Sequence, residues 1–266
     1  MSRRMRLDAE LVRRGFARSR EQAADLISAG RVAVAGQTAG KAASQVGLDA
    51  AITVSGPAAG PAYASRGGHK LAGALSAFTG LTVAGRRCLD AGASAGGFTD
   101  VLLRGGAAHV TAVDVGHGQL AWNLRTDPRV TVLDGVNVRR LMPEQVAPAP
   151  GLITADLSFI SLVLVLPALA ACGAPDADFV LLVKPQFEIG KGKVGTGGVV
   201  RDPQLRAAAV TAVAAAAVKA GLGARGVVAS PLPGPSGNVE YFLWLQRGAD
   251  ALDPAALQRA ITEGPQ

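Results

Sequence analysis

From residue 86 onward, short apolar runs alternate with stretches of helical spacing. The apolar runs predict strands at 87–91, 109–114, 130–133, 151–155, 178–183, 225–229 and 239–246. The intervening stretches predict helices near 97–104, 118–125, 161–171, 203–220 and 254–263. Such alternation favours an α/β fold with a mostly parallel sheet between layers of helices. The last strand follows a short Pro/Gly/Asn turn, so we expect it to insert antiparallel, at or next to an edge.

The first 60 residues have a different pattern. Apolar positions after Arg6 predict a short helix that ends at Gly15, and Ser19 is expected to cap a second helix that ends at Gly30. Short strands are expected at 32–34 and 52–54. Residues 56–64 have the Gly, Pro and Ala content of a linker. We therefore predict a small α+β domain at 1–60, a linker at 61–64 and a larger domain at 65–266.

A helix is expected directly after the linker, with Leu71, Leu75 and Phe78 on its apolar face. Lys70 would lie in its first turn, where a positive charge opposes the helix dipole. This misfit makes Lys70 a functional candidate, although a solvated surface lysine is the ordinary alternative.

The positive net charge of the chain favours a negatively charged binding partner. The 266-residue chain is 49% hydrophobic and carries a formal net charge of +7, which is typical of a globular protein with a polyanionic partner. Eight arginines stand against four acids in the first 36 residues. Solvation of two helices would explain them equally simply, but the paired helix signals favour RNA contacts. The candidates for phosphate contacts are Arg4, Arg6, Arg18 and Arg20.

Two cysteines without disulfide spacing, and a basic N-terminus without an apolar segment after it, favour a cytoplasmic protein. His69 and His117 have no partner at metal-ligand spacing, so no metal is assigned. The uncharged stretch 157–175 is nearly long enough to span a bilayer. Its serines, prolines and glycine make a strand tip and a buried helix the better interpretation.

A glycine-rich loop between the first large-domain strand and its helix predicts a cofactor site. Strand, glycine loop and helix together let backbone N–H groups approach a ligand. An acid directly before the loop suits a ligand with an ammonium group and suits pyrophosphate poorly, which points to S-adenosylmethionine. The next strand ends in an acid placed to accept hydrogen bonds from ribose hydroxyls. The predicted cofactor-binding residues are Asp90, Gly92, Ser94, Gly96, Gly97, Phe98, Asp114 and Asp134. For Asp134, contact with an adenine amino group and an ordinary turn acid have nearly equal weight.

Charged residues also stand at the ends of three later strands. Asp156 closes the fourth strand, Lys184 closes the fifth, and Glu240 opens the last. Ligands bind outside the carboxyl ends of parallel strands, so these side chains are expected beside the glycine loop. A lysine that follows an apolar run is costly to bury unless it is paired.

Two resemblances follow from these residues. The pattern Arg6-Leu-Asp8, Gly15, Ser19-Arg20, Ala23, Leu26-Ile27, Gly30 and Val32 resembles the S4 RNA-binding domain. The set Lys70, Asp156, Lys184 and Glu240 resembles the Lys-Asp-Lys-Glu tetrad of RrmJ/FtsJ-type RNA 2′-O-ribose methyltransferases, which have a Rossmann-like sheet. With both domains, the chain resembles the TlyA family of rRNA 2′-O-methyltransferases, historically labelled hemolysins.

The resemblance implies S-adenosylmethionine-dependent 2′-O-methylation of ribosomal RNA, at cytidine. We expect the partner to be ribosomal RNA in ribosomal subunits, and the sequence leaves open whether free RNA, a subunit or an assembled ribosome is the substrate. A ribose hydroxyl is a very weak acid, and a lysine accepts its proton only if the lysine pKa falls well below about 10.4. We assign Lys184 as the base or hydroxyl-orienting group, with Asp156 positioning it, and leave open which lysine takes the proton. Lys191 and Lys193, in a glycine-rich loop, are candidates for RNA phosphate contacts, although a plain surface loop has equal weight.

Two other functions compete with this interpretation. A membrane-active hemolysin would use the basic charge and the apolar stretch 157–175, and an RNA-binding protein would keep the first domain with an inactive transferase domain. Against the hemolysin, the sequence shows neither an export signal nor a convincing membrane span, and the apolar stretch fits a Rossmann-like core. The complete tetrad and glycine loop argue against the inactive transferase domain. The sequence leaves the oligomeric state open.

Overall fold

The computed structural model describes residues 4–17, 19–48, 50–54, 63–190, 192, 194–234 and 236–264. The chain divides into two compact units, Met1–Ala62 and Tyr63–Gln266. Each unit has its own apolar core and is described by itself.

The N-terminal unit is a small α+β domain. Its elements are β1 (Arg4–Arg6), α1 (Leu7–Arg13), α2 (Arg20–Ser28), β2 (Val32–Val34), β3 (Gln37–Thr38), β4 (Gln45–Gly47) and β5 (Ile52–Val54). β1 pairs with β4, and β2 lies between β3 and β5. Leu7, Leu11, Ile27 and Val32 are buried together under these elements. As predicted, the Ser19 hydroxyl caps α2 by accepting a hydrogen bond from the Gln22 N–H at 3.1 Å.

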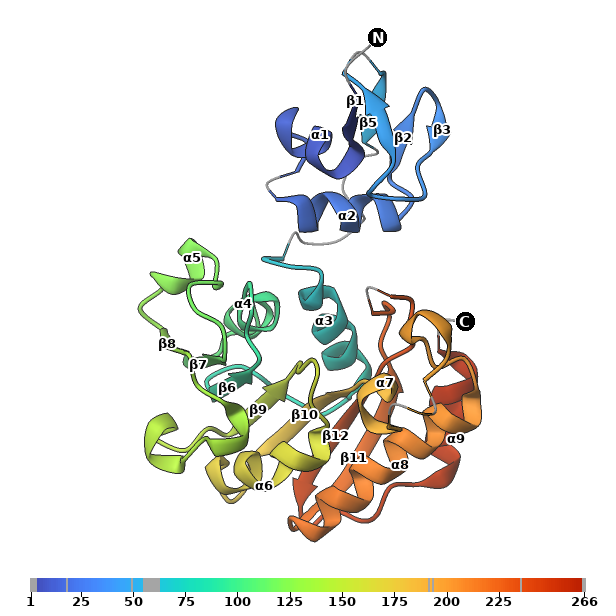
Figure 1. The fold of residues 1–266 in the computed structure, drawn as a ribbon. Helices are drawn as coiled ribbons and strands as arrows, with labels where there is room; N and C mark the ends of the chain where they lie inside the picture. The colour runs from blue at the N-terminus through green and yellow to red at the C-terminus, as the bar shows by residue number, and fades with distance from the viewer. Residues whose placement is uncertain are drawn as a thin grey trace. The chain divides into compact units, whose positions relative to one another are not determined.

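The large unit is built on a seven-stranded sheet in the order β11-β12-β10-β9-β6-β7-β8 (Figure 1). The strands β6, β7, β8, β9 and β10 are parallel, whereas β12 runs antiparallel to both β10 and β11. Their bounds are β6 (Arg87–Ala91), β7 (His109–Asp114), β8 (Val130–Asp134), β9 (Leu152–Ala155), β10 (Asp178–Val183), β11 (Leu222–Ala229) and β12 (Tyr241–Arg247). The predicted α/β fold with an antiparallel strand next to an edge is therefore confirmed.

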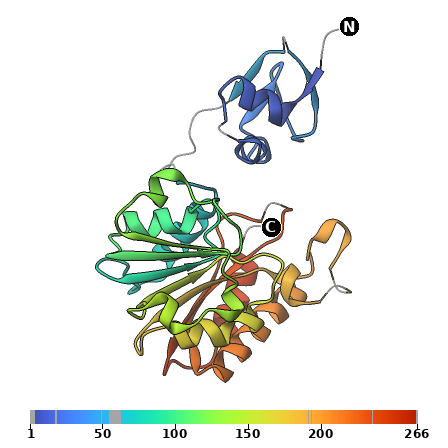
Figure 2. The same ribbon diagram turned by 60° about the vertical axis from the view of Figure 1, so that its left-hand side comes forward.

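Helices cover both faces of this sheet (Figure 2). Residues of α3, α4 and α5 form one apolar cluster with the sheet, and residues of α6, α8 and α9 form the other. The helix bounds are α3 (Gly67–Ala77), α4 (Gly97–Arg104), α5 (Trp122–Arg125), α6 (Leu162–Cys172), α7 (Pro185–Glu188), α8 (Pro203–Lys219) and α9 (Pro254–Glu263), with short 3₁₀ turns η1 (Val138–Arg140), η2 (Pro143–Val146) and η4 (Thr196–Gly198).

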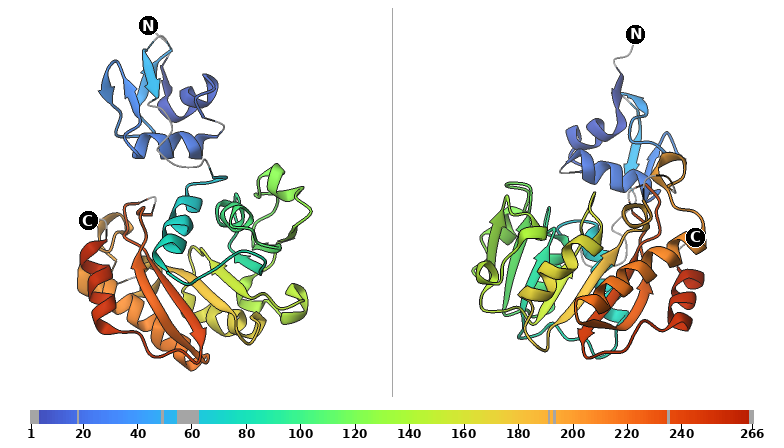
Figure 3. Two further views of the ribbon diagram at one scale, coloured as in Figure 1. Left: turned by 180° about the vertical axis from the view of Figure 1, so that it is seen from behind. Right: turned by 60° about the horizontal axis from the view of Figure 1, so that its bottom comes forward.

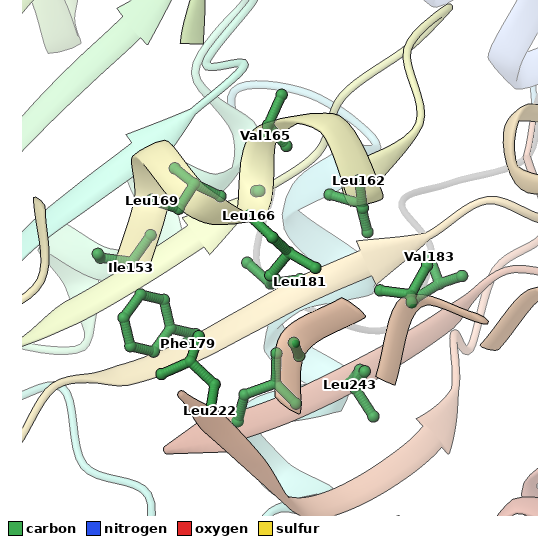
Figure 4. Packing of buried hydrophobic residues seen from close by; sticks show 14 of the residues in the cluster. Ile153, Leu162, Val165, Leu166, Leu169, Phe179, Leu181, Val183, Leu222 and Leu243 are labelled. Carbon is green, nitrogen blue, oxygen red and sulfur yellow. The ribbon is translucent and has the colours of Figure 1, made fainter. Parts of the chain in front are cut away.

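The apolar run of the sequence at 179–183 is explained by the position of strand β10 in the sheet. All six of its residues are buried. Phe179, Leu181 and Val183 pack with α6 on one face (Figure 4), and Val180 and Leu182 join the cluster on the other. A strand covered on both faces has no solvent-facing positions, so its polar alternation disappears.

The structure adjusts one sequence expectation and confirms another. The helix expected at 118–125 is reduced to α5, Trp122–Arg125, because Gly118 has a φ of +66° and Ala121, the N-cap, has an extended ψ of 139°, so helical geometry begins only at Trp122. The apolar stretch 157–175 contains α6, eleven residues long, whose Leu162, Val165 and Leu166 are buried against the sheet. Within the described ranges, no helix combines the length and apolar character needed to cross a membrane.

Strand β12 decides where Glu240 lies. It is seated between β10 and β11 (Figure 3), with Val183 opposite Tyr241. Because β12 runs opposite to β10, the start of β12 lies beside the carboxyl end of β10. Glu240, directly before β12, therefore lies at the edge where the parallel strands end.

Asp178, at the start of β10, connects this strand to β12 and to the residue before β6. Its carboxylate accepts hydrogen bonds from Trp244 Nε1 at 2.8 Å and Arg86 Nη1 at 2.6 Å. We expect Asp178→Ala to lower the free energy of unfolding by about 2–4 kcal/mol, because a buried indole N–H and a guanidinium lose their acceptor. Urea denaturation measures this change. Arg259→Ala, which removes an exposed ion pair of 3.9 Å, should change it by less than about 1 kcal/mol; equal effects of the two variants would contradict the prediction.

Candidate active site

The carboxyl edge of the parallel strands gathers the predicted catalytic residues. β9 ends at Ala155 and is followed by Asp156, and β10 ends at Val183 and is followed by Lys184. The Asp156 N–H donates to the Ala91 carbonyl at 3.0 Å, which ties the tip of β9 to the tip of β6. The start of the glycine loop and the first of the predicted catalytic carboxylates, Asp156, are thus neighbours.

Lys70 and Glu240 form a buried ion pair. Lys70 comes from the first turn of α3, and its Nζ lies 2.5 Å from Glu240 Oε2, with side-chain exposures of 6% and 1%. Burial raises the pKa of Glu240, while the positive charges of Lys70 and Lys184 act in the opposite direction. The lysine that opposes its own helix dipole is therefore held by a carboxylate from the other end of the domain.

Lys184 and Asp156 form the second pair. Lys184 Nζ lies 2.5 Å from Asp156 Oδ1 and donates a hydrogen bond to Ser158 Oγ at 3.0 Å. Lys184 is 10% exposed and Asp156 is 22% exposed. Both members of this pair act on the pKa of Glu240, so the two pairs form one electrostatic cluster. The structure therefore brings together all four side chains that the sequence singled out.

The glycines of the loop are required by the protein that surrounds them. A Cβ on Gly92 would lie 2.5 Å from the Asp156 carbonyl oxygen, and one on Gly97 would lie 2.8 Å from the backbone nitrogen of Gly68. Gly96 has a φ of +96°, and its Cβ would collide with Leu124. The sequence expectation was that these glycines leave room for a ligand. The structure shows a second use of their small size, which is to pack the loop against α3, α5 and the tip of β9.

Asp90 is the strongest candidate for holding the predicted cofactor. It is fully buried, its Oδ2 accepts a hydrogen bond from Thr99 Oγ1 at 2.7 Å, and its Oδ1 has no partner among the described residues. Burial raises the pKa of Asp90 to about 7, with the charges of Asp156 and Asp114 adding to the rise. A buried carboxylate oxygen without a donor is costly and fits a ligand that brings an ammonium group.

The other predicted cofactor residues are placed unevenly. Asp114 accepts from the Ser94 N–H at 2.8 Å and from the Gly116 N–H at 2.7 Å, one on each oxygen. A carboxylate oxygen accepts more than one hydrogen bond, so Asp114 keeps capacity for ribose hydroxyls. Asp134 is ion-paired with Arg125 at 2.7 Å, which favours the turn-acid alternative. Phe98 is buried against Phe242 with ring centroids 6.0 Å apart, so only its backbone is available to a ligand.

Two residues of the site were not assigned from the sequence. Thr99 donates to Asp90, and Ser158 accepts from Lys184. Each is a small hydroxyl residue close in sequence to a predicted acid, nine positions after Asp90 and two after Asp156. That proximity is too common a signal to single them out without coordinates. Among the residues that the structure describes, no three His, Cys, Asp or Glu side chains gather as metal ligands would.

In the N-terminal unit, buried acids hold the arginines. Asp8, almost fully buried, is ion-paired with Arg6 at 2.9 Å and with Arg20 at 3.0 Å. Both guanidinium groups remain about half exposed, at 44% and 59%. Arg4 is exposed on β1. The predicted RNA contacts Arg18, Lys191 and Lys193 lie outside the described residues.

Comparison with known proteins agrees with both domains. The FtsJ-like methyltransferase family matches residues 63–247, and the S4 domain matches residues 5–52. A 16S/23S rRNA (cytidine-2'-O)-methyltransferase TlyA of Mycobacterium tuberculosis is 61% identical over 270 residues, with both chains covered completely. Hemolysin A of Brachyspira hyodysenteriae is 37% identical over 90% of this chain and 98% of its own length.

A solved structure described as a putative hemolysin from Streptococcus thermophilus is similar over 99% of this chain and 96% of its own, with 36% identity and a TM-score of 0.78. Sequence relatives and fold thus agree over the whole length. The chain belongs to the TlyA family, which joins an S4 domain to an FtsJ-like methyltransferase domain.

Proposed function

We propose that the protein methylates the ribose 2′-hydroxyl of a cytidine in ribosomal RNA. The observation that carries this proposal is the pair of buried lysine–carboxylate contacts, Lys70–Glu240 and Lys184–Asp156, at the sheet edge beside Asp90. The 61% identical relative supports the target, since its name specifies cytidine 2′-O-methylation of 16S and 23S rRNA.

The methyl donor is S-adenosylmethionine, which supplies an activated methyl group on a positively charged sulfur. The free oxygen of Asp90 would hold its ammonium group, and Asp114 would accept from its ribose hydroxyls. Ser94 and the backbone from Gly92 to Phe98 would line the remaining side. In this arrangement the donor is held by the tips of β6 and β7, next to the lysines.

Lys184 is the group that we propose to accept the proton of the ribose hydroxyl. A primary amine accepts a proton only in its neutral form. Asp156 fixes the position of the Lys184 Nζ through a contact of 2.5 Å. Most of the rate gain would come from holding the hydroxyl oxygen close to the methyl group and in line with it.

Lys70 and Glu240 complete the wall of the site. Their contact spans 170 residues of sequence and joins α3 to the start of β12. Burial raises the pKa of Glu240 because its negative charge is poorly solvated. The positive charges of Lys70 and Lys184 stabilise that negative charge. We propose that this pair orients the acceptor ribose and shields Lys184 from water.

RNA recognition is assigned to the N-terminal unit. Asp8 holds Arg6 and Arg20 side by side with their guanidinium groups half exposed, an arrangement suited to phosphate oxygens. We propose ribosomal subunits as the form in which the RNA is bound, Lys191 and Lys193 as further phosphate contacts, and the cytoplasm as the location.

Replacing Lys184 tests the proposed base. We expect Lys184→Ala to reduce tritium transfer from labelled S-adenosylmethionine to ribosomal subunits by at least about a hundredfold, the lower range of general-base effects. Binding of S-adenosylmethionine by calorimetry should remain close to that of the unchanged protein. Lys219→Ala, which changes an exposed residue in the last turn of α8, is the matched control and should transfer normally. Substantial transfer by Lys184→Ala would remove Lys184 from this role.

The raised pKa of Asp90 predicts how cofactor affinity depends on pH. Below pH 7 the free protein holds Asp90 protonated, whereas an ammonium ligand requires the carboxylate. Affinity should therefore rise by about tenfold between pH 5.5 and 7.0. Calorimetry in buffers of different ionisation enthalpy should show proton release. Asp90→Asn should bind more weakly and without this dependence; a flat profile in the unchanged protein would contradict the assignment.

The raised pKa of Asp90 also makes the free energy of unfolding depend on pH, and here the effect of rising pH is unfavourable. Between pH 4 and 7 the folded protein holds a proton on Asp90 that the unfolded chain has lost, so the free energy of unfolding should fall as pH rises through this window. The comparison of the unchanged protein with Asp90→Asn, by urea denaturation at several pH values, isolates this contribution.

Arg20 tests the RNA contact. Arg20→Ala should weaken binding to ribosomal RNA and reduce the slope of log affinity against log salt by about one, because one phosphate contact is lost. Asp8 keeps Arg6 as a partner in this variant, so the fold should persist. S-adenosylmethionine binding should be unaffected. An unchanged salt slope would show that Arg20 only neutralises Asp8.

A further inference from the structure

The Lys184 ammonium group has two neighbours of different character. Asp156 Oδ1 lies 2.5 Å away and supplies a full negative charge. Ser158 Oγ lies 3.0 Å away and is the one hydrogen-bond acceptor that the described part of the chain gives to Nζ. An ion pair has little directional preference, whereas a hydrogen bond to a hydroxyl fixes the direction of one N–H. The carboxylate therefore sets the charge and the serine sets the orientation.

Orientation matters because of the geometry of an amine. The three hydrogens of an ammonium group interchange by rotation about the Cε–Nζ bond. With one N–H fixed by Ser158 and a second position facing Asp156, only one position remains for the lone pair once Lys184 is neutral. Without Ser158, the lone pair has more than one position available, and only one of them faces a bound hydroxyl.

We propose that Ser158 is a positioning residue for Lys184, one that directs its proton-accepting lone pair toward the ribose hydroxyl. This inference rests on the proposed function of Lys184 as the base. Ser158 touches Lys184 and is not itself proposed to contact substrate.

The segment that carries Ser158 is held by the segment that carries Lys184. Four residues after Lys184, Glu188 accepts hydrogen bonds from Ser161 Oγ at 2.5 Å and from the Leu162 N–H at 2.8 Å. Between these contacts, Phe159 adopts a φ of +63° and lies 92% exposed. A left-handed conformation in a bulky residue persists only where its surroundings impose it. Lys184 thus contacts the 158–162 segment at its first residue, and Glu188 contacts it at its last two residues.

Glu188 is suited to this task by its setting. It is partly buried, and burial raises its pKa, while the hydrogen bonds from Ser161 and Leu162 oppose that rise. Its carboxylate also lies at the N-terminus of α6, where Ser161 is the N-cap. The contact therefore both caps α6 and fixes the distance between Ser158 and Lys184.

The test is the pH–rate profile of Ser158→Ala in single-turnover methyl transfer, with donor and RNA saturating. We expect the plateau rate to fall by about threefold to tenfold. The acidic limb should move to lower pH by about half a unit, because an acceptor that favours the ammonium form is gone. The charged groups around Lys184 that remain to set the limb are Asp156, Glu240 and, through Glu240, Lys70.

Conservative variants separate positioning from structure. Ser158→Thr keeps the hydroxyl and should restore both plateau and limb, since residue 158 is exposed and has room for a methyl group. Glu188→Gln should stay close to normal, whereas Glu188→Ala should reproduce the Ser158→Ala profile. The double variant should be no slower than the slower single variant, because both act through the same lysine. Ser76→Ala, on the exposed side of α3, is the control.

Outcomes for the two proposals are distinguishable. An unchanged plateau and limb in Ser158→Ala, with Lys184→Ala inactive, would overturn the role of Ser158 and leave Lys184 as the base. Substantial transfer by Lys184→Ala would overturn the proposed base itself. A reduced plateau with an unmoved limb, or failure of Ser158→Thr to restore it, would make Ser158 merely structural and would also overturn the inference.

Discussion

Holding two lysine charges away from water is the constraint on which the rest of the large domain depends. A buried ammonium group without a partner costs several kcal/mol, so each lysine needs a carboxylate at contact distance. Lys70 and Lys184 meet that need with Glu240 and Asp156, each at 2.5 Å. The four residues come from α3, the tips of β9 and β10, and the start of β12. The order and direction of these strands is therefore inseparable from the site.

The donor side and the acceptor side of the site are coupled by contact and by charge. Gly92 packs directly on the backbone of Asp156, so the glycine loop cannot move without the tip of β9. The Asp156 charge also contributes to the raised pKa of Asp90. A positive charge placed near Asp90 or Asp156 would thus lower the electrostatic repulsion between the two carboxylates. Binding of a cationic donor beside Asp90 would change the electrostatic setting of Lys184 as well.

Much of this arrangement could be predicted from the sequence because its signals are local. Apolar runs gave the seven strands of the large sheet, and residues directly after those runs gave Asp156 and Lys184. What could not be predicted depends on contacts between distant segments. The reason for each glycine is a particular neighbour, such as Asp156 or Gly68, and the role of Ser158 depends on a distance to Lys184 across two strands. Strands β1, β3 and β4 are two or three residues long and carry no periodicity.

The late position of β12 has a consequence for how the protein is made. β10 pairs with β9 on one side, but its other edge waits for a strand that begins at Tyr241, after α7, α8 and β11 have been synthesised. At the pace of a ribosome, that edge stays open for on the order of several seconds, and an open apolar edge invites pairing with another chain. Glu240 also arrives only then, so Lys70 waits through 170 residues for its carboxylate. The nascent chain therefore has no complete active site until its final strand is in place.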